Sequence, residues 1–594
     1  MRVTFLLLLT IFFIVVQKSL CDPLVLIEEG ITEYFRTRTR PGYLENSIRE
    51  ALIRTSSKLG EDGMHCALCR IVTKIVIEYR RAGTNNEIIG DIGKDLCTLF
   101  ADIGYVTCVG YIDLTIDTFV FIIDNKPDIT PERFCAIRLQ EYGCVDPNYV
   151  PWRIDLPPGR SPSLPRRPSG QTTSVLHLTD IHYDPLYQPE SNADCEDVLC
   201  CEITSGIPKQ AIHEAGFWGD YRPCDMPWQS FENLLSQVKN KHRIDSVYLT
   251  GDIISHQVWN TSKEYNQLYI TQVLEKIQHT FGTTPVYPIL GNHEAHPTDF
   301  YPPNSVEGDF SISWLLDYVA EEWSRWLPTS TLTTIRQGGF YTVLVKPGFR
   351  IIALNSNVCF TNNIWLVYDD VDPYNQLQWL SDTLLEAEKN QEAVHILSHI
   401  PPGDIECSQQ WSHEFRRIIE RFHNTITGQF NGHTHNDEFK VFFSQIEKDK
   451  VINVAFNGGS FTTYVGLNPN YKVYTLELED GRMLESEQWT FNLSEANQDP
   501  YTSPKWYKLY SFSDIYGFEP FNLPQYQNLI HNMSINEQLL QNYHRLQVRN
   551  STAALRTKCE DGCLRNLFCG IISVEYKDLI ECRKQKQSGV HDEL

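Results

Sequence analysis

This sequence has no surplus of basic residues. Its 594 residues include 51 Lys and Arg against 75 Asp and Glu, which gives a formal net charge of -24 at pH 7 with His neutral. This balance excludes nucleic acid as the main partner, since its phosphates would be repelled. Anionic membranes are also repelled at neutral pH, but less so once carboxylates are protonated, which leaves anionic lipids as partners at low pH.

Long apolar runs are also scarce. The run from Phe5 to Val16 follows Arg2 and precedes the small residues Ser19 and Cys21. This pattern predicts a cleaved signal peptide over residues 1–21. A membrane anchor is the alternative, although the run is short for a bilayer span. No other segment is expected to be long and apolar enough to cross a membrane.

Cysteine, by contrast, is plentiful. Sixteen of the seventeen cysteines remain if Cys21 leaves with the signal peptide, and an even number in a secretory chain implies disulfides. The last four residues, 591–594, read HDEL, an endoplasmic reticulum retrieval signal. Four glycosylation sequons support passage through the lumen, at Asn260, Asn492, Asn532 and Asn550.

Six of the cysteines fall within residues 62–146, where the sequence has helical periodicity. Apolar residues at helical spacing from Leu68 to Tyr79 predict an amphipathic helix, and further helices are expected around residues 88–100, 109–123 and 131–140. The pair Cys66 and Cys69 has neither the strand–helix context of a redox motif nor the second close pair of a zinc site. The polar residues 22–61 ahead of it predict a helical lead-in.

This six-cysteine helical pattern resembles the saposin family over about residues 62–146. The resemblance implies a V-shaped all-α module that opens to contact lipid. A stapled bundle that serves only as a spacer is the alternative, but residues 112–123 are more apolar than so small a core needs. The resemblance also implies the disulfides Cys66–Cys144, Cys69–Cys135 and Cys97–Cys108.

The rest of the chain predicts three further parts. Seven prolines within residues 147–173 indicate an extended linker, with Trp152 and Ile154 as apolar anchors. Residues 174–490 alternate short apolar strands with helical stretches, which predicts an α/β sandwich. Residues 491–594 predict a helical cap packed on that domain. The expected local disulfides are Cys195–Cys200, Cys201–Cys224, Cys359–Cys407, Cys559–Cys563 and Cys569–Cys582.

Residue types that bind metals follow five apolar runs, where buried strands are expected to end. The clearest tract is Gly291-Asn292-His293-Glu294, directly after the apolar residues 286–290. Tracts at the ends of neighbouring strands would converge on one rim of a sheet. The other four tracts begin at Thr179, Gly251, His399 and Gly432.

The five tracts, if they converge on one edge of a sheet, predict a two-metal hydrolase. Two metals need a bridging ligand, and Asp252 is the natural bridge because the two oxygens of a carboxylate can serve two ions. Imidazole and carboxylate donors suit two zinc ions, with manganese or iron as alternatives. For any single histidine an ordinary structural role is the alternative. One metal is assigned to Asp180, His182, Asp252 and His435, and the other to Asp252, Asn292, His399 and His433.

These tracts resemble the calcineurin-like metallophosphoesterase family. Purple acid phosphatases share much of the set, but they have a tyrosine just after Gly-Asp, where this chain has Ile253, and a glycine in place of His182. This difference favours zinc over an iron–tyrosinate pair. With the saposin-like module ahead, the chain resembles the acid sphingomyelinase family from about residue 62 to near its end, including the tract that spans residues 462–469.

The resemblance also implies roles for three further residues. His293 and His256 would face the scissile phosphate, and Tyr464 would lie near the substrate. A hydroxide held by the metals would attack phosphorus, while an imidazolium would protonate the leaving ceramide alkoxide. We take His293 as the first choice for this general acid, with His256 sharing or orienting the proton.

The predicted function is hydrolysis of membrane sphingomyelin to ceramide and phosphocholine by a monomer. One alternative is a sphingomyelinase-like phosphodiesterase that acts on nucleotides or other soluble phosphodiesters. Another is a lipid-binding or lipid-transfer protein with an inactive phosphatase domain. The resemblance implies a secreted or lysosomal protein, whereas HDEL implies retrieval to the endoplasmic reticulum, so the two signals disagree.

Overall fold

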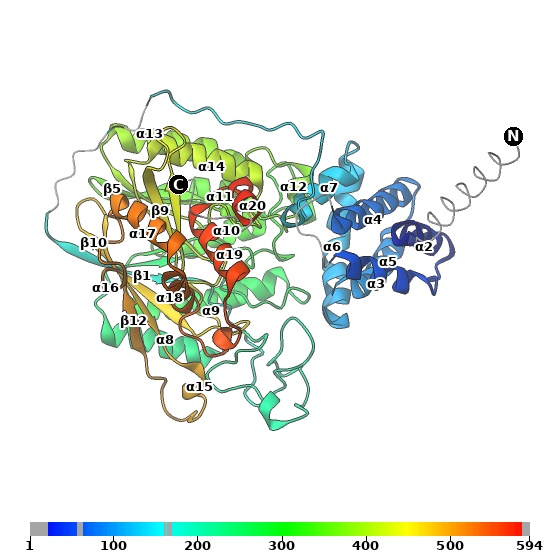
Figure 1. Cartoon of the computed structure of the whole chain (residues 1–594), viewed down its shortest axis with the longest axis horizontal. Helices are drawn as coiled ribbons and strands as arrows, with labels where there is room; N and C mark the ends of the chain where they lie inside the picture. Colours follow the sequence, from blue (N-terminus) through cyan, green and yellow to red (C-terminus); the bar gives the residue numbers. More distant parts are fainter. Residues whose placement is uncertain (1–21, 56–62, 102, 160–161, 163–168, 585–594) are drawn as a thin grey trace, which may run out of the picture. The chain divides into compact units, whose positions relative to one another are not determined.

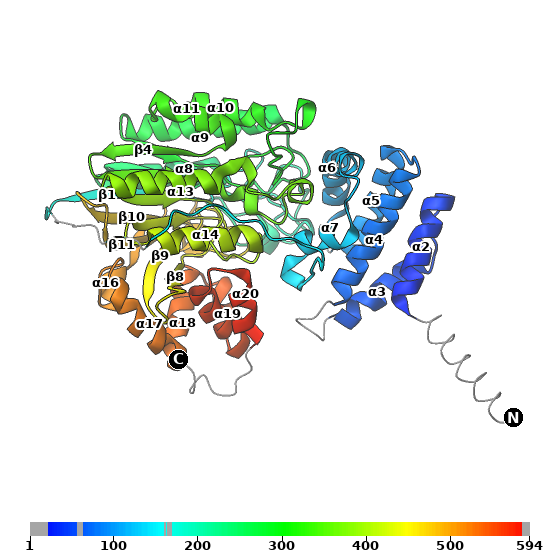
Figure 2. The same ribbon diagram turned by 90° about the horizontal axis from the view of Figure 1, so that it is seen from above.

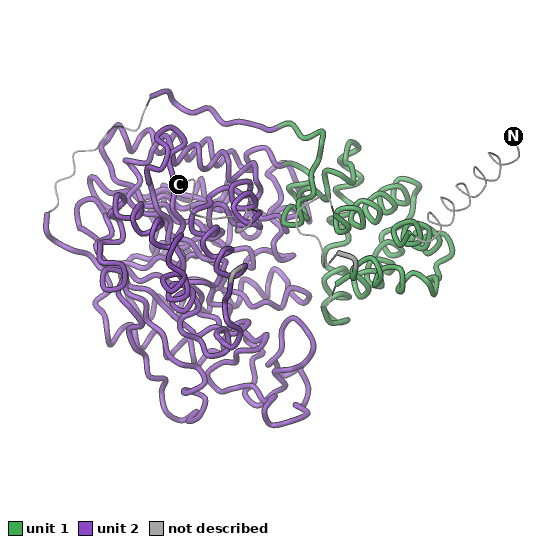
Figure 3. Tube along the Cα trace, in the orientation of Figure 1, with its two compact units in different colours: residues 1–150, 364–369 green, residues 151–363, 370–594 purple. Residues whose placement is uncertain are grey.

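The structure, a computed structural model, describes residues 22–55, 63–101, 103–159, 162 and 169–584. It divides into two compact units (Figure 3). Unit 1 consists of residues 1–150 and 364–369, and unit 2 of residues 151–363 and 370–594. The predicted signal peptide and the HDEL sequence lie outside the described residues.

Unit 1 is helical throughout its described residues. Asn85 caps α5 by accepting a hydrogen bond from Ile88 N, and Thr130 caps α7 ahead of Pro131. The disulfides Cys66–Cys144 and Cys69–Cys135 join α4 to the end of the unit, and Cys97–Cys108 joins α5 to α6. The helices are α2 (Pro23–Thr37), α3 (Leu44–Thr55), α4 (Met64–Arg81), α5 (Asn86–Phe100), α6 (Tyr105–Asn125), α7 (Pro131–Arg138) and α12 (Trp365–Tyr368).

Helix α6 corrects one expectation. By length and composition it is apolar enough to cross a membrane, which the sequence analysis expected of no segment after the signal peptide. Within its most apolar window, 39% of the residues are buried inside the structure. Thr115 and Thr118 are buried, whereas Ile112 and Leu114 are only partly buried and Val106 is 59% exposed. Much of the apolar surface of α6 is therefore not used by the core of unit 1.

Unit 2 contains two six-stranded mixed sheets, which confirms the predicted α/β sandwich. The first has the order β12 (Tyr507–Ser511), β11 (Met483–Thr490), β10 (Asn470–Glu477), β1 (Thr172–Leu178), β2 (Ser246–Leu249), β3 (Val286–Pro288). The second has the order β4 (Tyr341–Lys346), β5 (Phe349–Ala353), β6 (Ala393–Leu397), β7 (Ile426–Asn431), β9 (Val451–Asn457), β8 (Phe439–Phe443).

Helices cover the outer faces of the two sheets. In Figure 1, α13 (Gln376–Lys389) and α14 (Gln409–Phe422) lie on one side of the sheets and α8 (Trp228–Lys241) on the other. Helix α8 connects β1 to β2, and α9 (Lys263–Phe281) connects β2 to β3. These connections make β1, β2 and β3 parallel, as are β5, β6 and β7. Parallel neighbours end at the same edge, so the loops that follow them meet there.

The inner faces of the two sheets pack directly against each other. Tyr248 of β2 and His395 Nδ1 of β6 form a hydrogen bond of 2.8 Å, and the ring of Phe430 contacts both. His177 and His395 are fully buried, and burial lowers the pKa of each to about 3. These two histidines are neutral structural residues rather than ligands.

The linker and the C-terminal region both pack on the sandwich. Trp152 O accepts a hydrogen bond of 2.6 Å from Gln410 Nε2, and Ile154 N donates one of 3.2 Å to Glu414. Figure 2 shows the C-terminal helices grouped beside β8 and β9. The C-terminal region is not wholly helical, because it supplies edge strand β12. Its main helices are α17 (Leu523–Ile535), α18 (Glu537–Gln547), α19 (Asp561–Ile572) and α20 (Tyr576–Lys584).

Five further disulfides lie in unit 2, and they join the pairs named from the sequence. Two are in the loop after β1, one joins the loops after β5 and β6, and two are near the end of the chain. They are Cys195–Cys200, Cys201–Cys224, Cys359–Cys407, Cys559–Cys563 and Cys569–Cys582.

Candidate active site

The five tracts named from the sequence meet at the edge where the parallel strands end. Several of the side chains that they bring together sit on residues with positive φ, a conformation that is uncommon outside glycine and concentrates at functional sites. A Cβ at Gly291 would collide with Asp252, so glycine is needed there for the two tracts to approach. The positive-φ residues are Asp180, His182, Asp252, His433 and His435.

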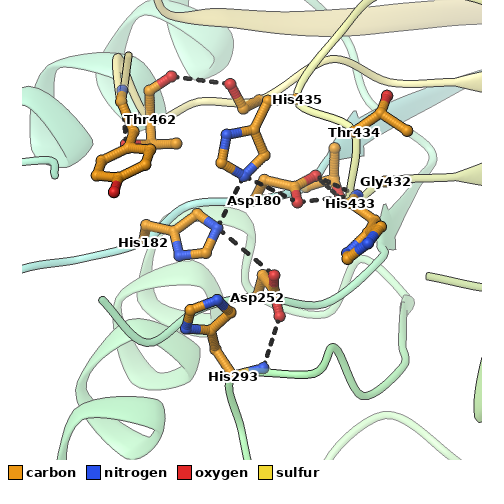
Figure 4. Close-up of polar contacts among 12 residues, drawn as sticks. Asp180, His182, Asp252, His293, Gly432, His433, Thr434, His435 and Thr462 are labelled. Atoms are coloured by element: carbon orange, nitrogen blue, oxygen red, sulfur yellow. Dashed lines mark hydrogen bonds and ion pairs between the residues drawn. The ribbon is translucent and has the colours of Figure 1, made fainter. Parts of the chain in front are cut away.

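The first group of side chains is built around His182 and His435 (Figure 4). Their Nε2 atoms lie 3.1 Å apart. His182 Nε2 is 3.5 Å from Asp252 Oδ2, and His435 Nε2 is 3.6 Å from Asp180 Oδ1. The four residues assigned to one metal are therefore within reach of a single point.

The second group centres on Asn292 and His399. Asn292 Oδ1 lies 3.1 Å from His399 Nε2 and 3.0 Å from His433 Nδ1. Asp252 Oδ2 is also 3.1 Å from His399 Nε2. Asp252 thus faces both groups, which is the position that a bridging carboxylate needs.

The donor set fits divalent cations. His182 Nδ1 lies 2.8 Å from Ile254 O, and since a carbonyl only accepts, Nδ1 carries the proton and Nε2 presents a lone pair. Asp252 Oδ2, an acceptor only, lies 3.5 Å from that nitrogen, and a cation stabilises two lone pairs that face each other in this way. Burial lowers the pKa of His399, but the Asp252 carboxylate outweighs it and raises that pKa to about 9. The second group therefore also attracts positive charge, which a metal ion supplies as well as a proton does.

Glu294 holds two of the tracts together from behind. Its carboxylate accepts hydrogen bonds from Gly291 N (2.5 Å), Asp252 N (3.1 Å) and Ile253 N (2.6 Å). The last residue of the Gly-Asn-His-Glu tract is thus a positioning residue for Asp252.

His256 and His293 lie beside the first group but have different partners. His256 Nδ1 is 2.9 Å from Asp225 Oδ1, and its ring stacks on His182, with centroids 4.0 Å apart. His293 Nδ1 is 3.1 Å from Ser255 O, a neutral acceptor. Burial lowers the pKa of both rings, but Asp225 reverses this for His256 and raises its pKa, whereas the pKa of His293 falls to about 4.

Comparison with known proteins identifies the family. Residues 173–437 match the calcineurin-like phosphoesterase family. The chain is 36% identical over 512 residues to sphingomyelin phosphodiesterase of Bos taurus, covering 83% of this chain and 80% of that protein. It is 34% identical over 554 residues to the Homo sapiens protein of the same name, and the match covers 90% of this chain and 85% of that protein. The chain belongs to the sphingomyelin phosphodiesterase family.

This membership confirms the prediction of a phosphoric diester hydrolase, and the phosphoesterase domain implies divalent metal binding. A Homo sapiens acid sphingomyelinase-like phosphodiesterase 3b is 28% identical over 428 residues, which is 68% of this chain and 89% of that protein. The similarity to the sphingomyelin phosphodiesterases thus extends over more of the chain.

Two residues of the site were missed from the sequence. Asp225 follows Cys224 in the disulfide-stapled loop and also accepts a hydrogen bond of 3.0 Å from Thr462. Arg549 comes from the C-terminal region, is fully buried and donates to His435 O at 2.5 Å. Burial lowers the pKa of Arg549 to about 10. Neither follows an apolar run, so no local pattern pointed to them.

Tyr464 packs against His256. Its ring stacks on that of His256, with centroids 4.0 Å apart and an interplanar angle of 6°. Its hydroxyl donates a hydrogen bond of 2.7 Å to Val198 O, which fixes the ring against the disulfide-stapled loop. Tyr464 therefore lies where a molecule in contact with His256 would meet it.

Proposed function

We propose that this chain hydrolyses sphingomyelin to ceramide and phosphocholine at a two-metal centre. The main support is the position of Asp252, whose carboxylate faces both ligand groups at distances of 3.1–3.5 Å. Relatives named sphingomyelin phosphodiesterase that align with most of the chain support the substrate class.

We propose zinc for both positions. Asp180, His182, Asp252 and His435 would hold one ion, and Asp252, Asn292, His399 and His433 the other. This set of imidazole nitrogens and carboxylate or amide oxygens suits zinc, with manganese and iron as the alternatives. When bound, two such ions lower the pKa of solvent and offset the charge of phosphate oxygens.

The protein groups supply the proton that the leaving group needs. Ceramide leaves as an alkoxide, which is a poor leaving group unless it is protonated. His256 is placed for this role, because Asp225 at 2.9 Å orients its ring and stabilises the imidazolium. His293, the first choice from the sequence, has only a carbonyl at Nδ1 and no carboxylate there to stabilise its imidazolium, so we do not assign it the proton.

Unit 1 would bring the lipid substrate into reach. Helix α6 leaves Ile112 and Leu114 only partly buried and Val106 exposed, so it offers apolar surface to a bilayer. A headgroup at a membrane surface is accessible to a metal centre only if the enzyme docks on that membrane. We therefore retain lipid contact as the role of residues 62–146, in a protein that acts as a monomer.

One experiment separates this function from its rivals. The zinc-loaded full-length protein is incubated with sphingomyelin vesicles and, separately, with ATP as a soluble nucleotide substrate. We expect phosphocholine and ceramide from the vesicles and little turnover of ATP. Faster turnover of ATP would favour a nucleotide phosphodiesterase, and no turnover of either would favour a lipid-binding protein.

The eight disulfides fit a protein of the secretory pathway. Within that pathway we propose a secreted or lysosomal location, with retrieval by residues 591–594 as the competing prediction. Secretion of the full chain is compared with that of a variant without these four residues. Greater secretion of the shortened chain would show that the signal retains the protein.

A further inference from the structure

Next to the metal centre, buried oxygen atoms gather that have no hydrogen-bond partner among the described residues. They come from three places in the chain: the disulfide-stapled loop after β1, the loop after β2, and α9. Asp184, Glu202 and Gln257 are 2%, 3% and 3% exposed. The atoms are Asp184 Oδ2, Glu202 Oε1, Ser255 Oγ, Gln257 Oε1 and the Tyr265 hydroxyl oxygen.

Backbone pairing brings these segments together. Tyr183 pairs with Ile254, which sets Asp184 beside Ser255. Tyr187 pairs with Glu202, and Tyr187 N donates to Asp184 O at 3.3 Å. The two acids are thus carried by neighbouring stretches of backbone.

Each acid has one oxygen occupied and one free. Asp184 Oδ1 accepts a hydrogen bond of 2.8 Å from Leu186 N. Glu202 Oε2 accepts one of 2.8 Å from the Thr204 hydroxyl. The other oxygen of each acid has no hydrogen-bond partner among the described residues, which leaves both available to a ligand.

A buried pair of acids needs positive charge. Among the described residues, no Lys, Arg or His forms an ion pair with Asp184 or Glu202. Burial raises the pKa of Glu202 to about 7, although the Thr204 hydroxyl and the Gln257 amide oppose this. The residue that faces the acids is an amide rather than a base, so the protein itself provides no counter-charge.

We propose that Asp184, Glu202 and Gln257 bind a hard divalent cation of the calcium type, with the hydroxyls of Ser255 and Tyr265 at the margin. All five donors are oxygen atoms, which calcium prefers, whereas the neighbouring metal centre is rich in imidazole. None of these five residues is among the proposed zinc ligands.

Such an ion would link two loops that support the catalytic groups. Glu202 follows Cys201, whose disulfide partner Cys224 precedes Asp225, and Gln257 follows His256. The cation would therefore hold the segment with Asp225 against the segment with His256. It would act as a positioning ion, which contacts neither substrate nor zinc.

The test uses the full-length, zinc-loaded protein after dialysis into calcium-free buffer. Calcium chloride is titrated by calorimetry, with magnesium chloride in parallel, and Tm is followed at each calcium concentration. We expect one calcium per chain and a Tm that rises with calcium. Absence of both effects would overturn the proposal and favour a proton shared by the two carboxyls.

Variants locate the ion. Glu202→Gln should lose the calcium site, whereas Glu196→Gln, in the same loop with an 84% exposed side chain, should keep it. If Glu202→Gln does not fold, Gln257→Leu provides the same test without changing a charge. If Glu202→Gln or Gln257→Leu still bound one calcium per chain, these residues would not be the calcium ligands.

Terbium gives a spectroscopic readout of position. Terbium replaces calcium at oxygen sites, and its luminescence is excited through a nearby tyrosine. We expect luminescence from the wild-type protein, competition by calcium, and a several-fold loss in Tyr265→Phe. Equal luminescence in Tyr265→Phe would place the ion elsewhere.

Discussion

The Asp225 carboxylate lies 2.9 Å from His256 Nδ1 and also accepts the amide hydrogen of His256 at 2.6 Å. One acid therefore fixes both the ring and the backbone of the histidine that stacks on His182, a proposed metal ligand. This pairing connects the disulfide-stapled loop after β1 to the loop after β2. It is the reason that we assign proton donation to His256.

Replacing the orienting acid should slow the reaction without emptying the metal centre. We expect Asp225→Asn to lower kcat on sphingomyelin by about 10²-fold, the range of a general acid, with KM and bound zinc nearly unchanged. Asp245→Asn, an exposed acid near the start of β2, is the matched control and should keep wild-type activity. Loss of zinc in Asp225→Asn would instead assign this residue a role in building the centre.

The leaving group distinguishes the two histidines. A nitrophenolate leaves without a proton, so a variant without the general acid should recover on a nitrophenyl phosphodiester. We expect His256→Asn to lose about 10²–10⁴-fold on sphingomyelin but much less on bis(4-nitrophenyl) phosphate. His293→Asn should lose activity on both substrates to a similar extent. The reverse pattern would restore His293 as the donor.

The number of metal ions bound per chain tests whether Asp252 bridges two ions. Asp252 faces both groups, whereas His399 belongs to one, so Asp252→Ala should lose both ions and His399→Ala should lose one. Elemental analysis of the dialysed proteins gives the count of ions per chain. His395→Gln is the control, because this neutral histidine lies between the sheets and binds Tyr248. Two ions retained by Asp252→Ala would exclude it as the bridge.

Stability should depend on pH through Glu202. Burial raises its pKa from 4.5 to about 7, so the folded state holds this proton more tightly than the unfolded state does. Its unfavourable contribution is absent below pH 4.5, grows as pH rises from 4.5 to 7, and is then constant. Glu202→Gln should therefore gain stability relative to wild type over that range, by on the order of 2–3 kcal/mol at pH 7.5. Urea unfolding in calcium-free buffer at pH 4.5 and 7.5 measures the difference, and an equal difference at both pH values would exclude Glu202 as its source.

Unit 1 should matter only for membrane substrate. Val106→Glu places a charge on the exposed apolar surface of α6 and should reduce turnover of sphingomyelin vesicles several-fold, without changing turnover of bis(4-nitrophenyl) phosphate. Ile446→Glu is the control in unit 2, where the side chain is 63% exposed, close to the 59% of Val106. Removing residues 62–146 should have the same selectivity with a larger effect. Equal losses on the two substrates would falsify a lipid-specific role.

Local patterns in the sequence were sufficient to predict the sandwich and to find the candidate metal-binding tracts. A buried strand is a short apolar run, and the polar residues directly after it must lie at the end of that strand. Asp180, Asp252, Asn292 and His399 could be found in this way because strand ends in parallel sheets share an edge. Resemblance to known families, rather than spacing, supplied the three cysteine pairs within residues 62–146 and the roles expected of His256, His293 and Tyr464.

Only the tertiary structure brought Asp225 to His256 and Arg549 to His435, and only the tertiary structure placed β12 at the edge of the first sheet. The same holds for the unpaired acids Asp184 and Glu202 and for the partly buried apolar side of α6. These features depend on contacts between residues far apart in the chain. Hydrophobic periodicity reports which residues are buried, but it carries no information about which distant segment buries them.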